Sequence, residues 1–348
     1  FILSDVTGDG KISGADFHSI AGLGGTDTLF IDKADTVLDL SGLDQPGAGV
    51  ISGVECIDTS GYPNTKLIFD PATLTAMGVD ELKVAGGDTD TFILSGAGWL
   101  YVGRSGGGEC IYMDAAGKEL HLSANMKRIY DGSANADTMV LDDVSDDGVI
   151  TAADFASISG GLGVDTIAVG SYSSGVSVNL TGLPAGVISG IERIDLSGAG
   201  GNLLVLDAQT LTGMGLASGG VLTVTGTAED SFQLSGDWSY VSTGGGYCRY
   251  SDGAGRLLDV SESVRRVYQG STGDDTFRLE DITGGGVISL ANDVSGIHGL
   301  GGTDAITVSA DNITLDLTGL PKGSLTKIDG IEVIDLSGTQ NNHVVLDE

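Results

Sequence analysis

Oxygen-bearing side chains recur at a regular spacing in the segment DVTGDGKISGAD, residues 5–16. Its first, third, fifth, ninth and twelfth positions are Asp5, Thr7, Asp9, Ser13 and Asp16, and its sixth is a glycine. A hard cation such as calcium takes about six to eight oxygen ligands, and a loop with a glycine at the sharp turn offers them at this spacing. With the Lys11 carbonyl at the seventh position, the segment predicts a calcium loop. The alternative is a polar β-turn whose Asp side chains accept hydrogen bonds from their own backbone.

Two further segments can be compared with this one. The second has the same pattern, with candidate ligands Asp143, Ser145, Asp147, the Val149 carbonyl, Thr151 and Asp154. The third begins at Asp281, but Gly285 replaces the fifth-position Asp and one inserted residue moves the last carboxylate to Asp293. Because a carboxylate is lost and the spacing altered, we expect the third loop to bind calcium weakly or not at all.

The loops belong to a long internal repeat. Residues 1–138 align with residues 139–276, and a third, truncated copy occupies residues 277–348, so we expect the chain to be part of a longer array. Each copy is a series of short Val-, Ile- and Leu-rich strands closed by Gly or Asp-Gly, with few two-residue hairpin signals. This pattern predicts an all-β chain of parallel β-roll or β-solenoid units. Tandem β-sandwich domains are the alternative.

One short helix is expected in each repeat. The segment DPATLTAM has Asp70 as a predicted N-cap and Pro71 at the first helical position. The segment DAQTLTGM after Leu206 repeats the signal, with Asp207 as the cap.

The composition is strongly acidic. The chain has 348 residues, a formal net charge of -32, and 38 Asp among its 48 acidic residues. Such a chain repels nucleic acid and anionic membranes, so we expect no nucleic-acid partner. It contains no apolar run of about 18 residues, so we expect no membrane insertion. Bound divalent cations would relieve the self-repulsion, whereas the alternative is an acidic solubilising surface.

A second acidic motif is the segment GGLGVDTIA, residues 160–168, which fits the calcium-binding β-roll nonapeptide at every fixed position. In that motif glycines allow a tight turn, the Asp adds a carboxylate and the following aliphatic residue faces the core. Its carboxylate is Asp165, and partial copies centre on Asp27, Asp304, Asp137 and Asp275. Because the motifs are single rather than in tandem, each is either a calcium site or only a β-turn.

The remaining chemistry-bearing residues are few. Trp99 and Trp238 occupy equivalent positions, each followed two residues later by a Tyr, and predict either a sugar-stacking face or core packing. The four histidines are scattered without zinc spacing, so we expect solvated or core histidines and no enzyme. Cys56 and Cys110 lie in one repeat, and the sequence leaves open whether they pair.

The order of the motifs GDDTF, GGLGVDTI, DLTGL, GIERIDLSG, NLLVLDAQTL and DWSYV resembles the long repeats of giant bacterial repeats-in-toxin surface proteins, namely biofilm adhesins and S-layer-like chains. The acidic loop by itself resembles that of dockerins, which also use an Asp at the twelfth position. The first resemblance covers essentially the whole chain. It implies type I secretion, a calcium-dependent β fold at the bacterial cell surface, and a structural or adhesive role.

These observations predict a calcium-stabilised, extracellular repeat region that acts as a stiff spacer. A self-assembling S-layer or filament subunit and a glycan-binding module are the alternatives. The expected partners are accordingly neighbouring repeats of the same chain, copies of the chain itself, or cell-surface glycans.

Overall fold

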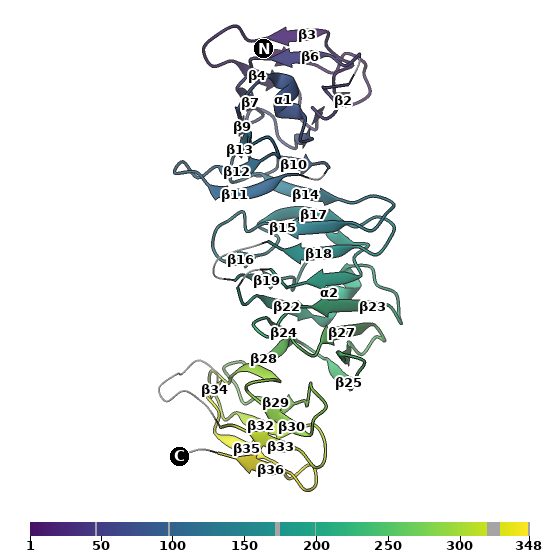
Figure 1. The fold of residues 1–348 in the computed structure, drawn as a ribbon, viewed down its shortest axis with the longest axis vertical. Helices are drawn as coiled ribbons and strands as arrows, with labels where there is room; N and C mark the ends of the chain where they lie inside the picture. Colours follow the sequence, from purple (N-terminus) through teal and green to yellow (C-terminus); the bar gives the residue numbers. More distant parts are fainter. Residues whose placement is uncertain (46, 97, 171–174, 199, 319–327, 347–348) are drawn as a thin grey trace. The chain divides into compact units, whose positions relative to one another are not determined.

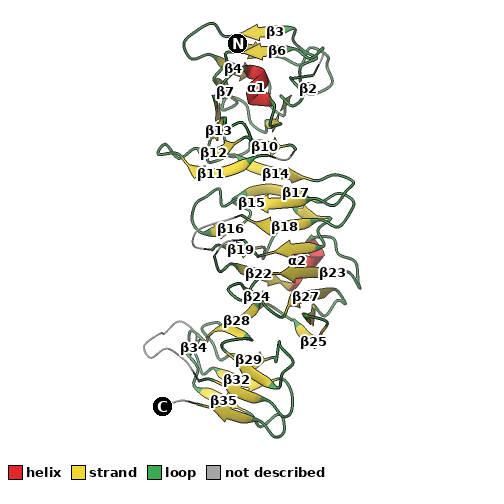
Figure 2. Cartoon of the chain, in the orientation of Figure 1, coloured by secondary structure: helices red, strands yellow, loops and turns green. Residues whose placement is uncertain are grey.

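The chain is nearly all β, as the sequence predicts. A computed structural model describes residues 1–45, 47–96, 98–170, 175–198, 200–318 and 328–346, with 42% strand and 3% helix. The strands form a parallel β-solenoid of about 12 turns (Figures 1 and 2). Residues 1–131 and 142–159 form one compact unit, and residues 132–141 and 160–348 form the second.

The first unit contains two long sheets and one strand pair. Its strands are β1 (Ile2–Leu3), β2 (Lys11–Ile12), β3 (Ser19–Ala21), β4 (Thr28–Ile31), β5 (Val37–Asp39), β6 (Val50–Ser52), β7 (Cys56–Asp58), β8 (Lys66–Phe69), β9 (Glu81–Ala85), β10 (Thr91–Leu94), β11 (Leu100–Arg104), β12 (Cys110–Met113), β13 (Glu119–Leu122), β14 (Lys127–Asp131), β16 (Val149–Ile150) and β17 (Phe155–Ser159). One sheet has the order β1-β4-β7-β9-β13-β12-β11, another runs β2-β5-β8-β10-β14-β17, and β3 pairs with β6.

The second unit repeats this order. Its strands are β15 (Thr138–Leu141), β18 (Thr166–Val169), β19 (Ser177–Asn179), β20 (Ile188–Ser189), β21 (Arg193–Asp195), β22 (Leu203–Asp207), β23 (Val221–Thr225), β24 (Ser231–Ser235), β25 (Ser239–Gly244), β26 (Tyr247–Ser251), β27 (Leu257–Ser261), β28 (Arg265–Gln269), β29 (Thr276–Leu279), β30 (Val287–Ser289), β31 (Val294–His298), β32 (Ala305–Val308), β33 (Thr314–Asp316), β34 (Ile328–Asp329), β35 (Val333–Asp335) and β36 (His343–Val345). Its sheets run β15-β18-β21-β23-β27-β26-β25, β19-β22-β24-β28-β31-β34, β29-β32-β35 and β30-β33-β36.

Parallel pairing between successive turns builds both units. Thr28 pairs with Cys56, and Cys56 pairs with Lys83, so one turn takes 27 or 28 residues. This pairing excludes the β-sandwich alternative. Each unit also carries an antiparallel hairpin addition, β11-β12-β13 and β25-β26-β27, which the sequence analysis did not specify.

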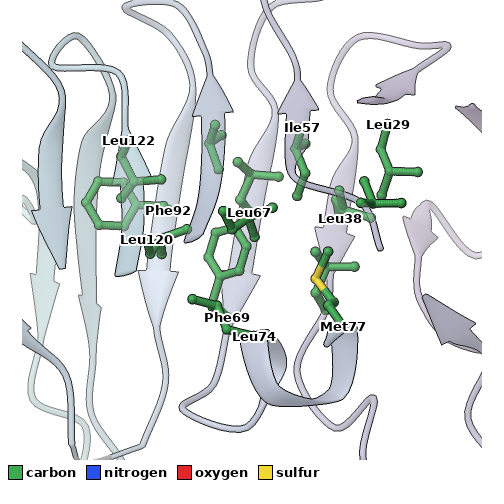
Figure 3. Close-up of a cluster of buried hydrophobic side chains, with 14 of the residues drawn as sticks. Leu29, Leu38, Ile57, Leu67, Phe69, Leu74, Met77, Phe92, Leu120 and Leu122 are labelled. Atoms are coloured by element: carbon green, nitrogen blue, oxygen red, sulfur yellow. The ribbon is translucent and has the colours of Figure 1, made fainter. Parts of the chain in front are cut away.

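The core consists of inward side chains stacked in columns. Leu38 pairs with Leu67, Leu67 pairs with Phe92, and all three side chains are fully buried in the cluster of Figure 3. Neighbouring strands lie about 4.8 Å apart, so each side chain contacts the equivalent one above and below it. Turns therefore stabilise one another by apolar contact as well as by main-chain hydrogen bonds.

Two short helices lie where the sequence predicts them, but their caps differ. In α2 (Ala208–Gly213), the Asp207 carboxylate accepts a hydrogen bond from the Thr210 N–H at 2.7 Å, and the Thr210 side chain completes a capping box. In α1 (Thr73–Met77), the predictions of Asp70 as N-cap and of Pro71 as the first helical residue are wrong, because Ala72 is the N-cap and Thr73 begins the helix. Asp70 instead accepts hydrogen bonds from the Ala72 N–H at 3.1 Å and from the Thr73 hydroxyl at 2.8 Å, in a turn that leads into the first residue of the helix. Neither described helix, five and six residues long, can cross a bilayer.

Candidate functional site

The first acidic loop is closed by its first and last Asp residues. Oδ2 of Asp5 accepts a hydrogen bond from the Gly10 N–H at 2.7 Å. Oδ1 of Asp16 accepts from the Thr7 N–H at 2.9 Å, and Oδ2 accepts from the Ser13 N–H at the same distance. The two carboxylates therefore fix the backbone of the loop between β1 and β2, and both are half-buried.

The second loop has the same bonds at the equivalent positions. Asp143 accepts from the Gly148 N–H at 2.8 Å. Asp154 accepts from the N–H groups of Ser145 and Thr151, both at 2.8 Å. The second loop is more deeply enclosed than the first, with Asp143 5% exposed and Asp154 1% exposed.

The third loop keeps the same hydrogen bonds from the backbone to its first and last Asp, despite its altered sequence. Asp281 accepts from the Gly286 N–H at 2.6 Å, and the displaced Asp293 accepts from the N–H groups of Thr283 at 3.1 Å and Ser289 at 2.9 Å. The inserted residue is therefore accommodated without loss of closure. What the third loop lacks is the fifth-position carboxylate, replaced by Gly285.

The fifth-position carboxylates of the first two loops belong to exposed residues. Asp9 accepts from the Lys11 N–H at 3.0 Å, and Asp147 accepts from the Val149 N–H at 2.8 Å. A carboxylate has about four lone-pair sites, so these bonds leave acceptor capacity for a cation. The candidate ligands are all oxygen donors, the type that calcium prefers. The donor set therefore fits a hard cation, although the same bonds would also close a polar turn.

The pKa values of the loop carboxylates shift in different directions because the loops are buried to different depths. At Asp5 and Asp16, desolvation acts to raise the pKa, but hydrogen bonds from backbone N–H groups outweigh it and hold the pKa below its ordinary value. At Asp154 and Asp293, desolvation dominates and raises the pKa despite similar hydrogen bonds. The second and third loops therefore hold buried carboxylates whose negative charge is destabilised.

The nonapeptide carboxylate Asp165 lies at a corner of the solenoid. Its Oδ1 accepts from the Asp137 N–H of the preceding turn at 2.7 Å, and its own N–H donates to Glu192 of the following turn at 2.9 Å. A Cβ at Gly160 would lie 1.8 Å from the Gly190 carbonyl oxygen, so only glycine fits there. Successive turns thus share a ladder of carboxylate-to-backbone bonds.

The other copies of the motif make equivalent bonds. Asp304 accepts from the Asp275 N–H at 2.8 Å and donates its own N–H to Glu332 at 2.8 Å, while Asp27 donates to Glu55 at 3.0 Å. The Oδ2 atoms of Asp27 and Asp304 are buried and accept no hydrogen bond from any residue that the structure describes. The corners therefore have a clear structural role, and two of them also contain an unused carboxylate oxygen.

The two tryptophans have different surroundings. Trp99 packs with Tyr101 against the core of the first unit. Trp238 is half-buried and lines a pocket of about 470 Å³ in the second unit, together with Tyr240 and Arg278. The sequence treats the pair as equivalent, but Trp238 lines a pocket whereas Trp99 packs against the core.

Each unit contains a buried arginine–carboxylate ion pair that the sequence did not predict. Arg128 lies 2.5 Å from Asp142, and Arg266 lies 2.6 Å from Glu280, with all four side chains largely buried. Each guanidinium also stacks over a tyrosine ring, 4.3 Å away in the first unit and 4.4 Å in the second. The available signal was the aligned pair KRIYDG and RRVYQG, each followed by an acidic residue at the same distance.

The side chains of Glu81, Glu119 and His121 also come together on the first unit, and the sequence analysis did not select them. The three cysteines are free, so Cys56 and Cys110 do not pair. The Cys110 thiol instead donates to the Val144 carbonyl at 3.7 Å.

No protein-family model and no curated protein matches this chain. Its function is therefore inferred from its own residues and geometry.

Proposed function

We propose that this chain is a calcium-stabilised repeat region of a large bacterial surface protein, acting outside the cell as a stiff structural or adhesive spacer. The observation that carries the proposal is the acidic loop, which recurs once in each repeat and is closed each time by the same first and last Asp bonds. The first and last Asp residues already close each loop, so the additional carboxylates of Asp9 and Asp147 supply negative charge and acceptor capacity beyond what closure requires.

Calcium would supply positive charge where the fold concentrates negative charge. The ligands would be Asp5, Thr7, Asp9, the Lys11 carbonyl, Ser13 and Asp16 in the first loop, and their equivalents in the second. The net charge of -32 opposes compaction, and each ion bound only by the folded state adds RT ln(1 + [L]/Kd) to its stability. At millimolar external calcium the chain folds, whereas at low internal calcium it remains exportable.

The spacer role rests on the parallel pairing of the strands. Main-chain hydrogen bonds and columns of buried side chains connect each turn to its neighbours within a unit. Such an array resists bending and extension more than a chain of loosely linked domains does.

Thermal unfolding and light scattering, first in EGTA and then in millimolar calcium, test the proposal. We expect calcium to raise the melting temperature strongly without increasing particle size. The double variant Asp9→Asn with Asp147→Asn should lose most of that increase. Asp88→Asn, an exposed Asp outside the loops, is the control and should retain it. An unchanged melting temperature in the parent chain would contradict the calcium mechanism, and ordered growth of particles would favour an S-layer or filament subunit.

Glycan binding is a second candidate function, favoured by the pocket beside Trp238. An aromatic ring next to Arg278 and the polar side chains of Gln269 and Ser309 is a suitable surface for a sugar. Trp238→Ala should abolish binding of any glycan that a glycan array detects, whereas Trp99→Ala should leave it intact. An array without hits, or equal loss in both variants, would contradict a site at this pocket.

A further inference from the structure

The outward face of the first unit gathers three metal-binding side chains on adjacent strands. Glu81 lies on β9, and Glu119 and His121 lie on β13. One ligand atom from each lies within 4.8 Å of the other two, and no other described residues form such a group. Glu81 and Glu119 are register partners, so the pairing of the two strands brings the carboxylates together.

The imidazole of His121 is held between carboxylates. Its Nε2 lies 2.9 Å from Oε2 of Glu119, and its Nδ1 lies 3.4 Å from Oε2 of Glu109. The residue is only 8% exposed, although it belongs to the outward face. Its ring is therefore held in place by neighbours on both sides.

We propose that His121, Glu119 and Glu81 form a zinc site. A nitrogen ligand with two carboxylates is a donor set that Zn²⁺ accepts, with a fourth position left to water, whereas calcium takes oxygen ligands alone. Glu109 would bind the second imidazole nitrogen and orient the ring, as carboxylates commonly do behind a zinc-bound histidine. The site therefore differs in chemistry from the acidic loops.

Lys83 competes with a metal ion for this site. Its Nζ lies 3.2 Å from Oε1 of Glu81, and its side chain is 51% exposed. Because the lysine stem is long and flexible, the ammonium can move into solvent when a divalent cation takes the carboxylate. Removing the lysine charge should accordingly strengthen metal binding.

The second unit lacks this donor set. The residues equivalent to Glu119 and His121 are Leu257 and Asp259, and Asp259 forms a bidentate pair with Arg249 at 2.6 and 2.7 Å. The site is therefore a property of the first repeat, and the whole chain should bind one Zn²⁺ there.

Competition with a chromophoric zinc chelator tests the proposal on the full chain, with excess calcium present to saturate oxygen-only sites. We expect one Zn²⁺ per chain, and loss of that binding in both His121→Gln and Glu119→Gln. Glu109→Gln should weaken affinity about 10-fold or more, since it removes the orienting carboxylate. Lys83→Gln should tighten it.

His298→Gln is the matched control, because His298 also contacts a carboxylate, Asp329 at 3.0 Å, without a third ligand. It should bind zinc as the parent chain does. Equal melting temperatures in the absence of zinc would show that the variants remain folded, and the Glu119→Gln variant keeps the imidazole if His121→Gln does not fold. Absence of saturable zinc binding, or binding that persists in both His121→Gln and Glu119→Gln, would overturn the proposal.

Discussion

Strands β13 and β27 occupy equivalent positions in the two units; their inward faces are alike and their outward faces differ. On the inward face, Leu120 and Leu258 are both buried and both apolar. On the outward face, His121 of the first strand corresponds to Asp259 of the second. The inward residues are constrained because each must fit the column above and below it, whereas the outward residues are free of that constraint. A repeat can therefore acquire distinct surface chemistry without changing its fold.

The largest expected effect is common to both units and tests the similarity of their interiors. Arg128→Met or Arg266→Met should lower the free energy of unfolding by about 3–5 kcal/mol, because either leaves a buried carboxylate without its partner. Urea unfolding measures the loss. The double variant Arg266→Met with Glu280→Leu should recover most of it, and a large loss in only one unit would show that the interiors are not equivalent.

The inward and outward faces can be compared directly by alanine substitution. Leu120→Ala and Leu258→Ala should each cost about 2–5 kcal/mol, because each leaves a cavity in a stacked column. Glu119→Ala on the outward face should change the free energy of unfolding by about 0.5 kcal/mol or less. Urea unfolding in the absence of zinc gives both values, and a costly Glu119→Ala would mean that the outward face also carries stability.

The acidic loops should respond to pH in opposite directions with and without calcium. In EGTA, the folded pKa values of Asp154 and Asp293 lie above the unfolded value of 3.8, so the folded state binds more protons and stability increases as the pH falls toward 3.8. Below 3.8, the lowered pKa values of Asp5 and Asp16 reverse the trend, because their contribution is lost as they become protonated.

Bound calcium requires ionised ligands, so in calcium we expect stability to decrease as the pH falls from neutral. Melting temperatures between pH 7 and pH 3 in the two buffers provide the measurement. Parallel pH profiles with and without calcium would contradict calcium binding by these carboxylates.

The smallest expected effect distinguishes the two helices. Asp207→Ala removes a capping box from α2 and should cost about 1 kcal/mol, whereas Asp70→Ala removes bonds from the Ala72 N–H and the Thr73 hydroxyl but none from a helical N–H, and should cost less. Urea unfolding of both variants tests this order. An equal cost would mean that the preceding turn is as important as the cap.

Much of this architecture is predictable from local signals. The turn glycines, the short apolar strands and the recurrence of residues 1–138 predicted the parallel solenoid, and the loop Asp residues were found by spacing alone. The Glu81–His121 group was not found, because Glu81 and Glu119 are far apart in the chain and meet only through strand register. The Arg128–Asp142 pair was missed for a different reason, because the burial of two charges is decided by packing rather than by local pattern.

The carboxylate ladder at the corners gives the chain a direction of assembly. The Asp137 N–H is capped by Asp165, 28 residues later, and Asp165 is capped in turn by Glu192. In a chain synthesised from its N-terminus, one corner therefore cannot be completed until another full turn has been made. Each turn depends on the next for its closing hydrogen bond, so folding would follow synthesis with a lag of one turn.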